Sequence, residues 1–203
     1  LAVLEALENG SPVRQAGAFQ IGFSVAHLRY FAGLARSYTF ERTGPLLHVP
    51  TLASGIVRRE PVGVCAAIVP WNFPLLLAMW KIGPALAAGN TLVIKPDEHT
   101  PLTLLEFARI AQECGLPPGV LNVVPGEGHV VGARLASHPD VRKIAFTGST
   151  AVGREIMRVA AGNIKRLTLE LGGKGPNIVL DDADLDLAAD GTLFGCLMNQ
   201  GQA

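Results

Sequence analysis

The chain has 203 residues, 49% of them hydrophobic, and its 17 lysines and arginines balance 17 aspartates and glutamates to a formal net charge of zero. This balance argues against nucleic acid or an anionic membrane as the main partner, because both select basic patches or stripes. Lys81 interrupts the apolar stretch after Leu75 before it could span a bilayer. The three cysteines show no Cys-x-x-Cys pair and no metal-ligand spacing, and all lie in apolar surroundings. This pattern predicts reduced, buried thiols, no metal and a cytoplasmic location.

The first 60 residues are predicted to be mainly helical. Apolar periodicity indicates helices over 1–8 and 19–39, and Thr51–Glu60 is typical of an exposed strand pair or arm. From Pro61 onward, apolar strand-like segments alternate with helical ones. The predicted strands are 62–69, 91–94, 120–124, 143–146, 167–169 and 177–180, and the predicted helices are 75–88, 101–114, 129–137, 151–161 and 184–198. This alternation predicts an α/β fold, a Rossmann-like parallel sheet with helices on both faces.

Two of these helices carry start signals. Thr100 and Pro101 fit an N-cap followed by proline at the first helical position. Asp181, Asp182 and Asp184 place negative charge at the positive end of the last helix. We therefore expect these side chains to fix where the two helices begin.

Ligands of parallel sheets bind beyond the carboxyl ends of the strands, so the loops after the strands are the candidate site. Two prolines fix the backbone around Asn72, and a rigidly held amide suits an oxyanion donor. A strand-ending turn with a capping asparagine would explain the same residues. After the second strand, Lys95 and Glu98 could hold the hydroxyls or phosphate of a nucleotide, or form a solvated pair.

The loop after the fourth strand, Thr147–Gly153, combines a glycine turn with hydroxyls at a helix start, and a helix N-terminus attracts phosphate. The spacing of Gly148 and Gly153 imitates a P-loop, but Arg154-Glu155 stand where Lys-Ser/Thr should be, which argues against an NTPase. The G-x-G-x-x-G fingerprint of dinucleotide folds is also missing. The sequence thus predicts a phosphate-binding turn without either usual motif.

Glu170 ends the fifth strand, which is apolar and expected to be buried, and a carboxylate there is costly unless it is paired, hydrated or used. Gly172 and Gly173 follow it and allow a ligand or backbone to approach closely. A general base and a capping glutamate before a glycine turn are both consistent with this pattern. The last segment, Asn199–Ala203, is a polar turn that closes the final helix.

Taken together, these loops resemble the aldehyde dehydrogenase superfamily. The resemblance covers nearly the whole chain, with the family's order and spacing, and its LELGGK and PWNFP pieces are highly specific. It rests on Ile68–Leu75 (IVPWNFPL), Gly89–Pro96 (GNTLVIKP), Phe146–Ser149 (FTGS) with Gly153, Leu169–Lys174 (LELGGK) with Pro176-Asn177, and Asn199–Gln202 (NQGQ).

The resemblance implies an enzyme that oxidises an aldehyde to a carboxylic acid with NAD(P)⁺ through a cysteine thiohemiacetal and thioester. Asn72 would donate to the oxyanion and Glu170 would be the general base. Lys95 and Glu98 would contact the adenosine ribose, and Leu171 and Gly172 would lie near the nicotinamide. The implied cofactor-binding residues are Val69, Trp71, Lys95, Glu98, Gly128, Thr147, Gly148, Ser149, Val152, Leu171 and Gly172.

The implied cofactor is NAD⁺, with NADP⁺ as the alternative, because a carboxylate at Glu98 would repel a 2′-phosphate. The family further implies a homodimer or homotetramer. We expect residues 1–60 to be the helices and arm of an incomplete cofactor domain, 61–180 its Rossmann-like core, and 181–203 the start of a link to a catalytic domain.

One departure from the family concerns the nucleophile. In the family, Gly-Gln-x is followed directly by the catalytic cysteine, and this sequence ends at the x, Ala203. We therefore expect an internal fragment that is inactive alone. Two other hypotheses stay open: a non-catalytic nucleotide-binding module, and a relative that makes acyl-coenzyme A or reduces acyl groups.

Overall fold

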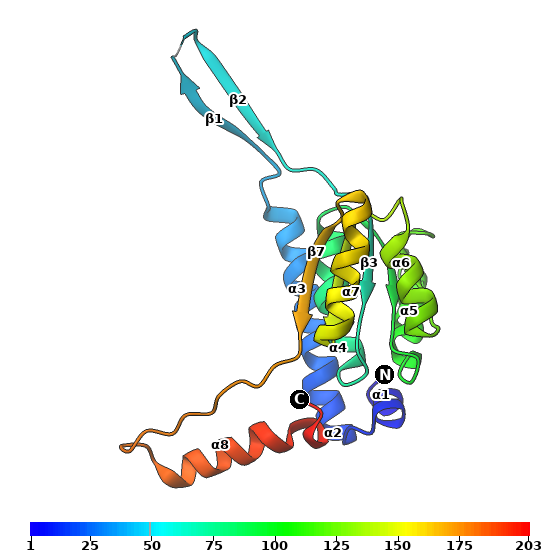
Figure 1. Cartoon of the computed structure of the whole chain (residues 1–203), viewed down its shortest axis with the longest axis vertical. Coiled ribbons are helices and arrows are strands. Elements are labelled where there is room, and N and C mark those ends of the chain that lie inside the picture. Colours follow the sequence, from blue (N-terminus) through cyan, green and yellow to red (C-terminus); the bar gives the residue numbers. More distant parts are fainter. Residues whose placement is uncertain (49) are drawn as a thin grey trace.

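The computed structural model describes residues 1–48 and 50–203, and its centre is a five-stranded parallel sheet (Figure 1). The strand order is β5-β4-β3-β6-β7, so the chain builds outward from β3 first in one direction and then in the other. The point of reversal lies between β3 and β6, where sheets of this kind bind ligands. The strands are β3 (Val64–Ile68), β4 (Thr91–Lys95), β5 (Leu121–Val123), β6 (Lys143–Gly148) and β7 (Arg166–Leu171).

Helices cover both faces of this sheet, which confirms the predicted Rossmann-like α/β fold. Helices α4 and α5 pack on one face, with α3 outside α4, and helices α6 and α7 pack on the other. Their bounds are α3 (Gly22–Ser37), α4 (Pro74–Ala87), α5 (Leu102–Glu113), α6 (Ala133–Ser137) and α7 (Thr150–Ala160).

The side chains of β3 alternate between two apolar cores. Cys65, Ala67 and Val69 join the core under α4, whereas Ala66 and Ile68 face α6 and α7. Because both faces are covered, β3 needs apolar residues throughout, as the sequence had predicted for a buried parallel strand. We call these two sides of the sheet the α4 face and the α7 face.

The remaining elements flank this core. A two-stranded antiparallel hairpin projects away from one end of the sheet, and the short N-terminal helices lie at the opposite end, at the bottom of Figure 1. The bounds of all these remaining elements are α1 (Ala2–Asn9), α2 (Val13–Gln15), the π-helical η1 (Ala16–Ile21), β1 (Glu41–Leu47), β2 (Ala53–Arg58), the π-helical η2 (Gly128–Gly132), the 3₁₀ turn η3 (Ala161–Asn163), α8 (Leu185–Leu197) and η4 (Met198–Gly201).

Three local predictions need correction. The exposed arm starts at Glu41, earlier than the predicted 51–60, because β1 forms despite Gly44 and Pro45, at which its pairing with β2 is irregular. The predicted strand 177–180 is absent: Pro176 and the glycines before it carry the chain away from the edge of the sheet after β7, and Ile178 is 75% exposed.

The third correction concerns the start of α5. Thr100 does not cap it, since α5 begins at Leu102 and the Thr100 hydroxyl makes no hydrogen bond within the described residues. Instead, the Glu8 carboxylate of α1 accepts the N–H groups of Leu102 (2.6 Å) and Thr103 (3.0 Å). A partner from a distant element has thus replaced the local cap. The Asp184 cap is present, with its Oδ1 3.1 Å from the Leu187 N–H.

The chain returns to the sheet at its C-terminal end. After β7 it runs outward, turns into α8, and comes back beside the N-terminal helices (Figure 1). None of the residues of α8 is buried. The return is fixed by hydrogen bonds, among them one from Gln202 Nε2 to the Asn9 carbonyl at 3.2 Å. The turn that ends the chain therefore lies next to α1 and the loop after β3.

Candidate active site

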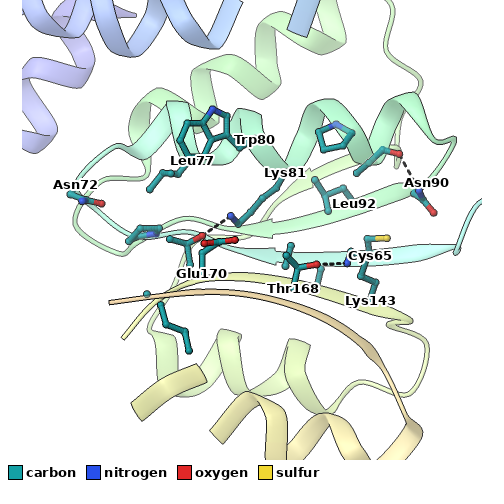
Figure 2. Close-up of a pocket in the computed structure, with 18 of the residues that line it drawn as sticks. Cys65, Asn72, Leu77, Trp80, Lys81, Asn90, Leu92, Lys143, Thr168 and Glu170 are labelled. Carbon is teal, nitrogen blue, oxygen red and sulfur yellow. Dashed lines mark hydrogen bonds between the residues drawn. The ribbon is translucent and has the colours of Figure 1, made fainter. Parts of the chain in front are cut away.

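A cavity of about 1150 Å³ lies between α4 and the part of the sheet formed by β3, β6 and β7 (Figure 2). The cavity forms because α4 covers β3 and β4 on this face but does not cover β7. Thr168 and Glu170 of β7 are therefore exposed. The cavity thus lies at the point where the strand order reverses. The expected site residues that line it are Trp71, Asn72, Thr147, Gly148, Ser149, Glu170, Leu171 and Gly172.

Glu170 faces a lysine across this cavity. Lys81 of α4 and Glu170 of β7 point toward one another (Figure 2), and the Lys81 ammonium donates to Thr147 Oγ1 at 2.7 Å. Thr147 and Glu170 are direct neighbours in the pairing of β6 with β7. Burial lowers the pKa of Lys81 to about 8, and the Glu170 carboxylate opposes this by favouring the charged form.

The sequence suggested that Glu170 ends a buried strand, and this prediction was wrong. The strand β7 is at the edge of the sheet and pairs with β6 on one side, so the side chains on its α4 face are exposed. An exposed carboxylate can contact solvent water directly. This position suits a group that must take a proton from water.

The depressed pKa of Lys81 predicts a pH dependence of stability. Lys81 has a pKa of about 8 in the folded protein and 10.5 as its ordinary value, so between these pH values the unfolded state binds more protons. The free energy of unfolding should therefore rise with pH in that window, whereas below it both states carry a charged lysine. We expect Lys81→Met to remove a rise on the order of 3 kcal/mol. Urea unfolding at several pH values measures this, and parallel curves for the two proteins would contradict it.

The loop that carries Asn72 is held from several directions. Pro74 starts α4 directly after it, and proline at a first helical position fixes the entry of the chain. The Asn72 carbonyl accepts hydrogen bonds from the side-chain amides of Asn199 (2.6 Å) and Asn9 (3.2 Å). Its own side-chain Nδ2 donates to the Gln202 carbonyl at 2.6 Å. Asn72 therefore lies against the end of the chain, and Ala203 lines the same cavity.

The turn between β6 and α7 has the form predicted for an anion site. Ser149 is the N-cap of α7, and its Oγ accepts the Val152 N–H at 3.3 Å. A side chain at Gly148 would lie 2.6 Å from the Phe146 ring, so this position requires glycine. A side chain at Gly153 would lie 2.5 Å from Leu171, which lets α7 approach the end of β7 closely.

Lys95 and Glu98 lie at the same edge of the sheet but on the α7 face. Lys95 is the register partner of Ile68, and both side chains approach Gly132 at the end of η2. Lys95 is 2% exposed, and its ammonium donates to the Pro96 carbonyl (2.7 Å) and to Glu98 Oε2 (3.0 Å). This hydrogen bond lowers the pKa of Glu98. The pair is therefore already formed, with its carboxylate facing outward.

The predicted residues thus form two groups on opposite faces of one sheet edge. Gly128 begins η2 on the α7 face, and Val152 is 48% exposed on the first turn of α7. The Val69 side chain is buried in the α4 core, which leaves its main chain to meet a ligand. A ligand that contacts both groups must cross the carboxyl edge of the sheet.

Comparison with known proteins identifies the family of this chain. The sequence model of the Aldehyde dehydrogenase family matches residues 1–203. The chain belongs to the aldehyde dehydrogenase family. The mitochondrial aldehyde dehydrogenase of Homo sapiens is 50% identical over 204 residues, which are 100% of this chain and 38% of that protein. The aldehyde dehydrogenase of Davidiella tassiana is 50% identical over 203 residues, again 100% of this chain and 40% of that one.

Solved aldehyde dehydrogenases share the fold as well. The NAD⁺ complex of the aldehyde dehydrogenase from Bacillus cereus superposes with a TM-score of 0.93 at 48% identity, over 100% of this chain and 40% of that one. The chain therefore spans about 40% of the length of the aldehyde dehydrogenases it matches. Over residues 1–48 and 50–203, no helix is long and apolar enough to cross a bilayer, and no cluster of three or more His, Cys, Asp or Glu could hold a metal.

The prediction from sequence missed one residue of this cavity. Lys81 is the only charged residue of α4, in a helix that is otherwise apolar. In the sequence, Lys81 was used only as the residue that interrupts an apolar stretch. Burying the charge of a single lysine in an apolar helix costs free energy unless the lysine has a partner. That cost was the signal that could have found it. Its partners, Thr147 and Glu170, come from two other elements.

Proposed function

We propose that the complete protein oxidises an aldehyde to a carboxylic acid with NAD⁺ as the hydride acceptor. The observation that carries this proposal is one cavity that combines the Asn72 loop, Glu170 with its lysine neighbour, and the N-terminus of α7. The chemistry of aldehyde oxidation through a thioester needs these three features: an oxyanion donor, a base for water, and a site for a phosphate-containing cofactor.

The residues present suit a dinucleotide. The N-terminus of α7, with Gly148 and Ser149 leading into it, presents helix N–H groups and a positive dipole end where a pyrophosphate would be stabilised. Glu98, with its pKa lowered by Lys95, offers an ionised acceptor for ribose hydroxyls. Trp71, Leu171 and Gly172 line the apolar side of the cavity near Glu170. When bound, NAD⁺ would supply the hydride acceptor for the oxidation.

The chain's own groups divide the remaining tasks. Asn72 would donate its amide to the substrate oxygen, the nucleophilic cysteine would follow Ala203, and Glu170 would take the proton of the water that releases the acid. Lys81 faces Glu170 across the cavity and donates to Thr147 beside it, so its ammonium would help to fix the position of the base. The separate faces for Glu98 and Glu170 would let one cofactor bind across the sheet edge, with its adenosine on the α7 face and its nicotinamide on the α4 face.

The direct test is an activity assay of the protein as its gene encodes it. Purified protein is incubated with NAD⁺ and a panel of short and long aliphatic and aromatic aldehydes, and NADH formation is followed. We expect NADH that depends on the aldehyde. Protein that binds NAD⁺ but forms no NADH with any aldehyde would instead support the nucleotide-binding module.

Glu98 predicts the choice of cofactor. Glu98→Gln should raise the ratio of kcat/KM for NADP⁺ to that for NAD⁺ by about tenfold, because it removes the negative charge that would repel a 2′-phosphate and leaves the Lys95 charge. Steady-state kinetics with both cofactors measure this ratio. Glu106→Gln, at another exposed glutamate with an ion pair, is the matched control. An unchanged ratio in Glu98→Gln would show that this carboxylate does not select the cofactor.

Further proposals concern the domain organisation, the oligomeric state and the cellular location of the complete protein. Residues 1–60, 61–180 and 181–203 would be the helices and arm of the cofactor domain, its core, and the link toward a catalytic domain. The projecting hairpin exposes Leu46, Leu47 and Ile56, which supports self-association as a homodimer or homotetramer. The three cysteines are free, which fits the reducing conditions of the cytoplasm. Cys65 is buried as expected, whereas Cys114 and Cys196 are exposed, so the prediction of burial was wrong for these two.

A further inference from the structure

A buried polar cluster connects the N-terminal helices to the loop of Asn72 through Asn199. The Asn199 side chain is 0% exposed, and its Nδ2 donates to the Asn72 carbonyl at 2.6 Å. Its Oδ1 accepts from Ser11 Oγ at 2.6 Å and from Gln20 Nε2 at 3.2 Å. One amide therefore joins three segments that lie far apart in the sequence.

The members of this cluster also support each other. Gln20 Nε2 donates to Ser11 Oγ at 2.7 Å, and the side-chain oxygen of Asn9 accepts the Ser11 N–H at 2.9 Å. Asn9 in turn donates to the Asn72 carbonyl. Ser11 is 4% exposed and Gln20 is 0% exposed. Hydrogen bonds in such a low-dielectric place are strong and costly to remove, so the bonds of Ser11, Gln20 Nε2 and Asn199 give the cluster a defined geometry. Gln20 Oε1 is the buried atom of these three side chains that has no hydrogen-bond partner within the described residues.

The backbone at this point takes an unusual conformation. Asn199 and Gln200 have φ values of 53° and 56°, in the left-handed region. Non-glycine residues there cost free energy and persist when surrounding contacts hold them. Gly201 follows with a φ of 77°, and Gln202 then accepts the hydrogen bond from Asn72 Nδ2 at 2.6 Å. The cluster thus holds a strained turn and the Asn72 loop against each other.

We propose that Asn199, held by Ser11 and Gln20, is a positioning residue that fixes the Asn72 amide relative to the chain leaving the turn at Ala203. The inference rests on the proposed function, in which Asn72 is the oxyanion donor. It assigns to the N-terminal segment 9–20 a part in catalysis, although no residue of that segment lines the cavity. A displacement of a reacting or donor group by about 1 Å can lower a rate by about 100-fold, so the geometry of this cluster should be visible in kcat.

The test uses two variants in the protein as its gene encodes it. Asn199→Ala should lower kcat by about 100-fold, since it releases the Asn72 carbonyl and the strained turn together. Ser11→Ala is a milder second variant that keeps the test decisive if Asn199→Ala does not fold. It should lower kcat by about tenfold with unchanged KM for the aldehyde and unchanged Kd for NAD⁺. Ser24→Ala is the matched control: the buried Ser24 hydroxyl donates to the Gln20 carbonyl at 2.7 Å and makes no hydrogen bond to Asn199 or Asn72.

A double-mutant cycle separates positioning from a merely structural effect. If Ser11 acts through Asn72, Ser11→Ala should change kcat by less than about twofold when Asn72 is already alanine. An equal factor in both backgrounds, or a loss no greater than that of Ser24→Ala, would overturn the inference. An Asn72→Ala enzyme with full activity would overturn the oxyanion role itself, and the inference with it. Thermal unfolding of each variant confirms that the compared proteins are folded.

Discussion

Replacing Glu170 with glutamine is expected to let the first turnover form NADH and then to stop the enzyme at the thioester. Glutamine keeps the shape of the side chain on β7 but cannot take the proton from the attacking water. General-base catalysis contributes on the order of 10²–10⁴ in rate, so the steady-state rate should fall by about 1,000-fold. Rapid-mixing kinetics should show a burst of NADH, about equal to the concentration of active sites, followed by a slow phase.

The control for this experiment is Glu155→Gln. Glu155 is an exposed glutamate on α7, paired with Arg158 and outside the cavity, so its replacement tests for the loss of a surface carboxylate alone. Mass spectrometry of the stalled protein should detect the added acyl group in Glu170→Gln and not in Glu155→Gln. A Glu170→Gln enzyme that forms acid at the wild-type rate would show that another group activates the water.

Replacing Asn72 with alanine is expected to lower kcat by about 10²–10³, the usual cost of losing one oxyanion donor. The effect should appear in the first turnover, because the oxyanion forms when the nucleophile attacks the aldehyde. The Kd for NAD⁺ should stay within about twofold, since the amide contributes mainly to the transition state. This pattern differs from that of Glu170→Gln, in which the first turnover survives.

Asn122→Ala is the matched control for Asn72→Ala. Asn122 is on β5 at the far edge of the sheet, and its side-chain amide also donates to main-chain carbonyls, those of Gly119 (2.8 Å) and Leu92 (3.3 Å). Its loss removes hydrogen bonds to main-chain carbonyls from a side chain that does not line the cavity. Rapid-mixing traces for both variants decide the matter, and an unchanged first turnover in Asn72→Ala would contradict the proposed donor.

The fold was largely predictable where local sequence and burial agree. The strand at 64–68 and the helix at 74–87 follow from an apolar segment buried on both faces and from prolines that bracket the intervening loop. The segment 177–180 has a similar apolar composition but forms no strand, since a strand also needs a partner edge to pair with. The prediction of a Thr100 cap was wrong for a similar reason, because the carboxylate of Glu8, from the distant helix α1, accepts the N–H groups at the start of α5.

The site was predictable in its parts but not in its arrangement. The rule that ligands bind after the strands located Asn72, Ser149 and Glu170, whose cavity the structure describes. Alternation along a strand does not reveal which residues of different strands share a face, so the separation of Glu98 from Glu170 needed the strand register. The roles of Lys81 and Asn199 depend on contacts across more than 60 residues of sequence, which no local pattern records.

The fate of the acyl group tests the central claim, hydrolytic oxidation of an aldehyde, most directly. The protein as its gene encodes it is given an aldehyde that it oxidises and NAD⁺, with and without coenzyme A, and NADH and the acyl product are quantified together. We expect equal amounts of NADH and carboxylic acid, unchanged by coenzyme A. NADH formation that requires coenzyme A and yields acyl-coenzyme A would contradict the assignment of Glu170 as the base for water.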